Sequence, residues 1–246
     1  MKKYLILLIP ALLLITITCS RKDEKSSVEL PQFSIQLTEE EKSGGLMTPE
    51  ILWKFRRLGS IALSPDGSTA LYTVTDRDIP TEAARTNIFS IPADGGESTQ
   101  LTQAGGSSPQ WIENGNKIAF ADEEGNLAVM DPAGEEIKTV EGLSGFDAFR
   151  ISPDGKKILF TRRVKLDQTA NEKHGLPNAR VRIINDLMYR HWNRWSDYSY
   201  SHIFVADFNG SRVSDEKDIM EGQKFESPLS PYFDDAEITW SPDSRY

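Results

Sequence analysis

"ISPDGKKILFTRR", residues 151–163, has a near twin in "LSPDGSTALYTV" at residues 63–74, and the same Ser-Pro-Asp turn returns in "WSPDSRY" at residues 240–246. Proline sets φ for the second position of such a turn, while Asp tolerates the third position and can bond the backbone locally. Glycine then takes the left-handed conformation that closes a hairpin. Because apolar residues alternate with polar ones on both sides of each turn, every copy is predicted to be a β-hairpin.

A second pair of strands follows each hairpin, so that each unit has four strands. These pairs are predicted in "NIFSIPADGGESTQLT" (87–102), "NLAVMDPAGEEIKTV" (126–140) and "HIFVADFNGSRV" (202–213). In the second unit, "WIENGNKIAFAD" (111–122) replaces Ser-Pro-Asp-Gly with a turn around Asn114 and Gly115. The hairpin turns begin near Ser64, Ile112, Ser152 and Ser241. The intervals between them are 48, 40 and 89 residues.

A four-stranded unit that recurs at roughly 40 to 45 residues is the signature of a β-propeller blade. The sequence therefore predicts an all-β fold over residues 46–246, a partial propeller with about three blades and the first strand of a fourth, "EITW". The long last interval predicts an insertion at about 164–201. Since a blade buries its faces only against neighbouring blades, we expect the natural chain to continue past Tyr246, or another chain to complete the ring.

The N-terminus has the features of an export signal. Lys2 and Lys3 precede the apolar run "YLILLIPALLLITIT" (4–18), which is short for a transmembrane helix and suits a signal peptide over residues 1–19. The single cysteine, Cys19, follows in "TITCS", which resembles a bacterial lipoprotein cleavage box. We expect a lipid anchor at Cys19 and a periplasmic or outer-membrane-associated lipoprotein of a Gram-negative bacterium. A single-pass anchor, or a soluble periplasmic protein that has lost Cys19, are the alternatives.

A tether and a short helix are predicted between this signal and the propeller. Residues 20–45 are charged and Ser-rich, so they bury too little apolar surface to offset chain entropy. Thr48 as N-cap, Pro49 at the first helical position and Gly59 beyond the end then predict a helix. Its expected apolar stripe comprises Ile51, Leu52, Phe55 and Leu58.

Charge and composition exclude several partners and cofactors. The formal net charge is −9, so most of the surface repels phosphate backbones, and we expect no nucleic-acid partner. The three histidines lack metal-ligand spacing, so the sequence predicts no metal site and no other cofactor.

Two segments resemble a known family. "MTPEILWKFRRLGSIALSPDG" (47–67) and "INDLMYRHWNRWSDYSYSHIFVADF" (184–208) are similar to exported bacterial serine peptidases of the prolyl oligopeptidase family, particularly dipeptidyl peptidase V-like and acylaminoacyl peptidases. The resemblance implies a propeller that caps a C-terminal α/β-hydrolase domain and filters peptide substrates for a Ser, Asp, His triad. The nucleophile would lie in a G-x-S-x-G elbow, which these 246 residues do not contain, so no catalytic residue is assigned.

The insertion concentrates cations and aromatic rings. Residues 163–201 carry nine Lys, Arg or His, and the candidate substrate-cavity residues are Arg190, His191, Trp192, Arg194 and Trp195. In one interpretation they line the cavity between the domains and offer Arg190, His191 or Arg194 to peptide carbonyl or carboxylate groups. In the other, the aromatic rings pack against the blade or the hydrolase domain, and the cations lie on a solvated rim.

Two functional hypotheses follow. The first is the substrate-gating propeller of an exported serine peptidase whose full-length form cleaves short peptides. The second is a non-enzymatic TolB-like propeller lipoprotein that binds proteins in the cell envelope.

Overall fold

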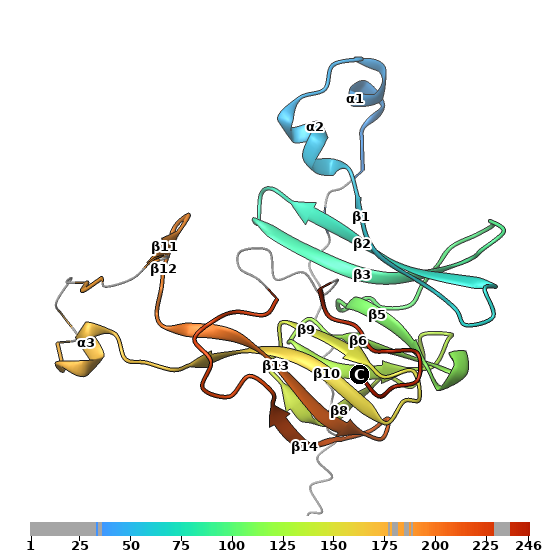
Figure 1. The fold of residues 1–246 in the computed structure, drawn as a ribbon. Helices are drawn as coiled ribbons and strands as arrows, with labels where there is room; N and C mark the ends of the chain where they lie inside the picture. Colours follow the sequence, from blue (N-terminus) through green and yellow to red (C-terminus); the bar gives the residue numbers. More distant parts are fainter. Residues whose placement is uncertain are drawn as a thin grey trace, which may run out of the picture. The chain divides into compact units, whose positions relative to one another are not determined.

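Three four-stranded antiparallel sheets follow one another along the chain in a computed structural model (Figure 1). The structure describes residues 33, 36–176, 178, 182–184, 187, 189–228 and 237–246, all within one compact unit. The signal peptide, Cys19 and most of the predicted tether lie outside these residues. No helix in the described part of the chain is long and apolar enough to cross a membrane.

We call the three sheets blades 1, 2 and 3. Blade 1 has the order β1 (Arg57–Leu63), β2 (Thr69–Asp78), β3 (Ala83–Pro92), β4 (Thr99–Gln100). Blade 2 has the order β5 (Ser107–Ile112), β6 (Lys117–Ala121), β7 (Asn126–Met130), β8 (Lys138–Ser144), with the 3-10 turn η1 (Glu113–Gly115) after β5. Blade 3 has the order β9 (Ala148–Ile151), β10 (Lys157–Lys165), β13 (Ser199–Phe208), β14 (Val213–Asp218). Each blade is a meander in chain order, which confirms the predicted partial propeller.

The Ser-Pro-Asp turns are built alike in all three copies. In each, the Ser hydroxyl donates to the Asp carboxylate, at 2.6 Å for Ser64 and Asp66, and accepts the backbone N–H five residues on, at 2.9 Å from Thr69. The Ser64 hydroxyl, together with the backbone N–H and hydroxyl of Ser68, donates to the Asp66 carboxylate and lowers its pKa to about 2. Gly67 (φ +73°) takes the left-handed conformation, as predicted. The corresponding distances in the other copies are 2.7 Å for Ser152 to Asp154 and 2.6 Å for Ser241 to Asp243.

Two apolar cores lie between adjacent blades. The core between blades 1 and 2 contains Leu71, Ile88, Leu101, Ile118, Phe120, Ala128 and Met130. The core between blades 2 and 3 is larger, and its rings Phe160 and Phe204 stack at 5.2 Å. Full burial of one such side chain contributes about 2 to 3 kcal/mol to folding. Each blade therefore depends on its neighbour for its apolar face.

Hydrogen bonds join the first strands of successive blades. The indole Nε1 of Trp111, the residue before the turn of blade 2, donates to the Ala62 carbonyl of blade 1 at 3.1 Å. Trp240 holds the same position before the last Ser-Pro-Asp turn, and its Nε1 donates to the Arg150 carbonyl of blade 3 at 3.0 Å. Between blades 2 and 3 the amide of Gln110 bonds β9 instead. Residues 240–246 thus lie against blade 3 as blade 2 lies against blade 1.

Three sequence-based expectations differ from the structure. The segment "EITW" forms no strand, because no second strand lies beside it among the described residues. Within the predicted tether, α1 (Glu39–Ser43) forms, and Glu41 pairs with Lys54 at 2.8 Å. The helix capped by Thr48, α2 (Pro49–Lys54), ends early because Phe55 is extended and the chain enters β1. Of the predicted apolar stripe, Ile51 is buried, whereas Leu52, Phe55 and Leu58 are exposed.

Candidate functional site

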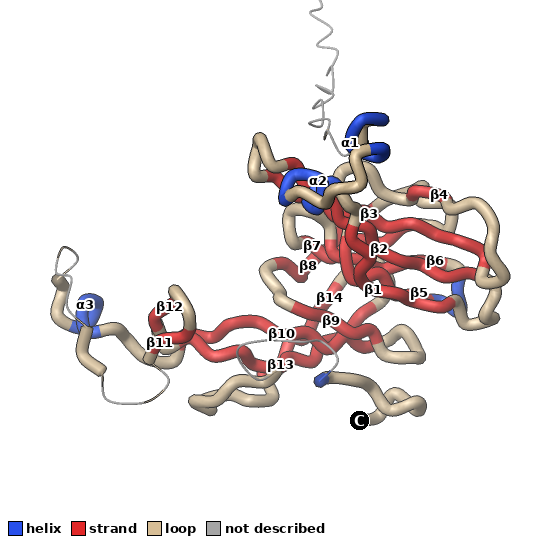
Figure 2. Tube along the Cα trace, turned by 90° about the horizontal axis from the view of Figure 1, so that it is seen from above, coloured by secondary structure: helices blue, strands red, loops and turns tan. Residues whose placement is uncertain are grey.

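An excursion leaves blade 3 at the end of the β10–β13 ribbon. The two strands pair as far as Lys165 and Ser199, so the excursion comprises residues 166–198. It contains α3 (Ala170–Lys173), β11 (Arg190–His191) and β12 (Arg194–Trp195). Figures 1 and 2 show these elements extending away from the three sheets. In blades 1 and 2 the corresponding connection is a short turn, so the excursion is the feature that distinguishes blade 3.

The predicted site residues form one small hairpin, which we call the aromatic hairpin (residues 189–196). Arg190 pairs with Trp195 and His191 pairs with Arg194. The two-residue turn begins at Trp192, whose φ of +49° is unusual for a bulky side chain. Trp192 is 84% exposed. The structure therefore brings together all five residues that the sequence singled out.

Cations surround the ring of Trp195. The guanidinium carbon of Arg182 lies 4.6 Å from the ring centroid, and that of Arg190 lies 5.0 Å from it. Tyr189 stacks on the same side chain at 6.1 Å. Cation–π contacts of this kind contribute about 0.5 to 1 kcal/mol at exposed sites. Arg182 is not among the predicted site residues, because no strand pattern in the sequence pairs it with Trp195, which lies thirteen residues further along the chain.

His202 joins β13 to the end of β14 and to the segment that follows it. Its side chain is fully buried in β13, with Nδ1 at 2.8 Å from the Asp218 carboxylate and Nε2 at 2.8 Å from the Gln223 carbonyl. Because a carbonyl oxygen only accepts, Nε2 carries a proton. This histidine therefore holds the segment that follows β14 against β13.

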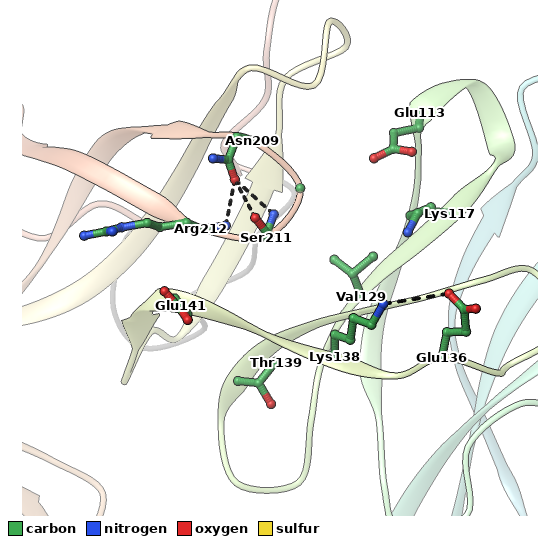
Figure 3. A pocket seen from close by; sticks show the side chains of 11 residues that line it. Glu113, Lys117, Val129, Glu136, Lys138, Thr139, Glu141, Asn209, Ser211 and Arg212 are labelled. Carbon is green, nitrogen blue, oxygen red and sulfur yellow. Dashed lines mark hydrogen bonds and ion pairs between the residues drawn. The ribbon is translucent and has the colours of Figure 1, made fainter.

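A polar groove of about 700 Å³ lies between blade 2 and the β13–β14 turn (Figure 3). Glu141 joins the two walls, because its backbone N–H donates to the Ser211 carbonyl at 2.9 Å. The charged side chains of the lining balance, three acidic against three basic: Glu113, Glu136, Glu141, Lys117, Lys138 and Arg212. Sequence reasoning missed this groove because its walls come from separate turns and strands. Its balanced charge favours neither an anion nor a cation.

The chain is similar to curated peptidases. It is 35% identical over 210 residues to dipeptidyl-peptidase 5 of Porphyromonas gingivalis, a match that covers 82% of this chain and 31% of that protein. It is 33% identical over 215 residues to dipeptidyl-peptidase 5 of Porphyromonas endodontalis, covering 85% and 31%. The chain thus spans about a third of the length of these relatives. No protein-family model matches it.

Among solved structures, the acylaminoacyl peptidase of Pyrococcus horikoshii superposes with a TM-score of 0.52 at 17% identity. The match covers 68% of this chain and 26% of that chain, and at this identity it shows the fold alone. The sequence matches confirm the resemblance to the propeller part of dipeptidyl peptidase V-like peptidases.

Proposed function

From the homology of this propeller segment to dipeptidyl-peptidase 5, we propose that the chain is the substrate-gating propeller of an exported serine peptidase that cleaves short peptides. The observation that carries the proposal is the 35% identity over 210 residues. The homologues named as peptidases favour this function over a non-enzymatic binding lipoprotein. Its partners would be a C-terminal α/β-hydrolase domain and peptide substrates, with a lipid anchor at Cys19.

Gating requires a rigid wall and an element that meets the peptide. The inter-blade cores and the bonds from Trp111 and Gln110 supply rigidity, because they fix successive blades to one another. The aromatic hairpin supplies exposed rings and guanidinium donors, which suit peptide carbonyl and carboxylate groups. We therefore assign substrate contact to this hairpin and the filtering of folded proteins to the blades.

The test begins with the coding region beyond Tyr246, expressed as one reading frame. We expect a G-x-S-x-G motif followed by Asp and His, and release of fluorophores from short N-terminally free or acylated peptides. A fluorophosphonate probe should label the nucleophile and abolish this activity. A reading frame that adds only further blades, with no labelled serine, would overturn the proposal.

Removal of the aromatic hairpin tests the gating itself. Replacing residues 189–196 with Gly-Ser should raise KM for short peptides, because their contacts with the hairpin are lost, and so reduce the preference for short over long peptides in kcat/KM. An unchanged length profile would show that the hairpin has no part in gating.

A further inference from the structure

Two arginines of the blades make bidentate contacts with a carboxylate, a contact that the described arginines of the excursion lack. Arg56 makes a bidentate contact with Asp76 at 2.7 and 3.2 Å, and Arg162 does so with Glu216 at 2.7 and 3.0 Å. No carboxylate of the described residues pairs with the described arginines of the excursion, Arg182, Arg190 and Arg194. Within the part of the excursion that the structure describes, these three guanidinium groups thus have no carboxylate at ion-pair distance.

We propose that Arg182 and Arg190, held on the ring of Trp195, form a binding site for the carboxylate of a short peptide. The inference rests on the proposed function and names the class of substrate that the aromatic hairpin selects. A carboxylate at a peptide C-terminus and one on an Asp or Glu side chain have the same chemistry, and the experiment below separates them.

Contact with the ring of Trp195 restricts both guanidinium groups. A guanidinium carries its N–H donors in one plane, and a carboxylate can accept two of them. The ring also displaces water from one face and restricts the side chain, so less entropy is lost on binding. Two such groups at 4.6 and 5.0 Å from one ring concentrate positive charge in a small volume.

The charge distribution of the chain points to the same ligand. The excursion, residues 166–198, carries five Lys or Arg and four Asp or Glu, a net charge of +1, within a chain of net charge −9. The remaining residues therefore carry −10, and the four Arg of the excursion fall within residues 180–194. A local cationic segment on an anionic protein attracts an anion to one place and repels it elsewhere.

Trp192 supplies an exposed apolar surface at the turn of the same hairpin. It is held at a positive φ and is 84% exposed, and its ring lies 6.0 Å from that of His191. Backbone strain of this kind persists where the surrounding structure enforces it, and it clusters at ligand sites. The ligand that fits is a carboxylate next to an apolar or aromatic side chain.

Calorimetric titration of the 246-residue chain tests the site without turnover, since the chain holds no G-x-S-x-G motif. The four probes are Ala-Ala-Phe with a free C-terminus, its C-terminal amide, Ala-Glu-Phe amide and Ala-Gln-Phe amide. If the site binds the C-terminal carboxylate, we expect the free acid to bind at least tenfold more tightly than its amide. If the site binds a side-chain carboxylate, Ala-Glu-Phe amide should bind at least tenfold more tightly than Ala-Gln-Phe amide. Either result supports the site, and equal binding of all four overturns it.

Substitutions locate the binding on the hairpin. Arg182→Gln with Arg190→Gln should weaken binding of the preferred probe at least tenfold, and Arg190→Lys, which keeps the charge but loses the planar fork, should weaken it less. The matched control is Arg57→Gln with Arg77→Gln, because these two arginines lie over one tryptophan ring, that of Trp53, at 4.8 and 5.6 Å, but at blade 1. An equal loss in the control would overturn the assignment. Circular dichroism of each variant checks that the fold is kept.

Two further outcomes separate this inference from its premise. Carboxylate-selective binding in a protein without peptidase activity would contradict the proposed function and support the binding site. Peptidase activity in the full reading frame with no preference for carboxylate probes would support the proposed function and contradict the binding site. If sedimentation showed that the double variant loses self-association instead of peptide binding, the arginines would be contacts between copies of the chain, and the site would be wrong.

Discussion

Two pairs of tryptophans show how differently this chain uses one residue type. Trp111 and Trp240 lie at the same repeat position, and each donates its indole N–H to a backbone carbonyl of the preceding blade. Trp192 and Trp195 lie in the excursion, where their contacts are with cations and other rings, and they stay 84% and 38% exposed. The first pair recurs with the blade period and joins blades. The second pair falls outside that period and belongs to neither apolar core of the described residues.

The largest expected effect comes from breaking the first pair. Trp111→Ala removes a ring that packs on the core between blades 1 and 2, so we expect a loss of about 3 kcal/mol in the free energy of unfolding. Trp111→Phe keeps most of the ring and loses only the bond to Ala62, which should cost about 1 kcal/mol. Urea unfolding followed by circular dichroism measures both. Equal losses in the two variants would show that packing contributes little at this boundary.

The next effect concerns the boundary between blades 2 and 3. Gly142 has φ +83°, and a Cβ there would lie 2.3 Å from the Val213 carbonyl oxygen. Gly142→Ala should therefore cost about 2 kcal/mol or more, from backbone strain and from the displaced strand. Gly145→Ala is the matched control, since Gly145 has φ +65° with open space around it and reports strain alone. If the two variants unfold at the same urea concentration, the backbone at Val213 moves away from residue 142 at little cost in free energy.

Sequence reasoning reached what is local and periodic. The Ser-Pro-Asp turns and the four strands of each blade follow from turn chemistry and alternation, and the structure has them. The end of α2 at Lys54 was missed because strand pairing from Arg57 outweighs the helical preference of the next residues. The bond from Trp111 to Ala62 also could not be predicted, because it depends on how two blades are placed.

The candidate site was predictable in composition but not in geometry. The cations and rings of residues 190–195 stand out in an anionic chain, and they do gather on one hairpin. Its turn was not recognised, because Trp rarely takes the positive φ that Trp192 has. The place of Arg182 beside Trp195 depends on how the excursion folds back, which no periodic pattern encodes.

The smallest expected effect on stability, from Trp192→Ala, decides between the two interpretations of the aromatic hairpin. The side chain is 84% exposed, so its removal should change the free energy of unfolding by less than about 0.5 kcal/mol, as for other surface substitutions. Urea unfolding of Trp192→Ala and of Trp111→Ala under the same conditions compares the two losses in the free energy of unfolding. The measurement should be made on the 246-residue chain and again on the full reading frame. A loss above about 1 kcal/mol that occurs only in the longer protein would mean that Trp192 packs against another domain, as the second interpretation holds. An unchanged stability in both, with weaker binding of Ala-Ala-Phe, would place this ring against the peptide, because a side chain that contributes nothing to folding is then needed for the ligand alone.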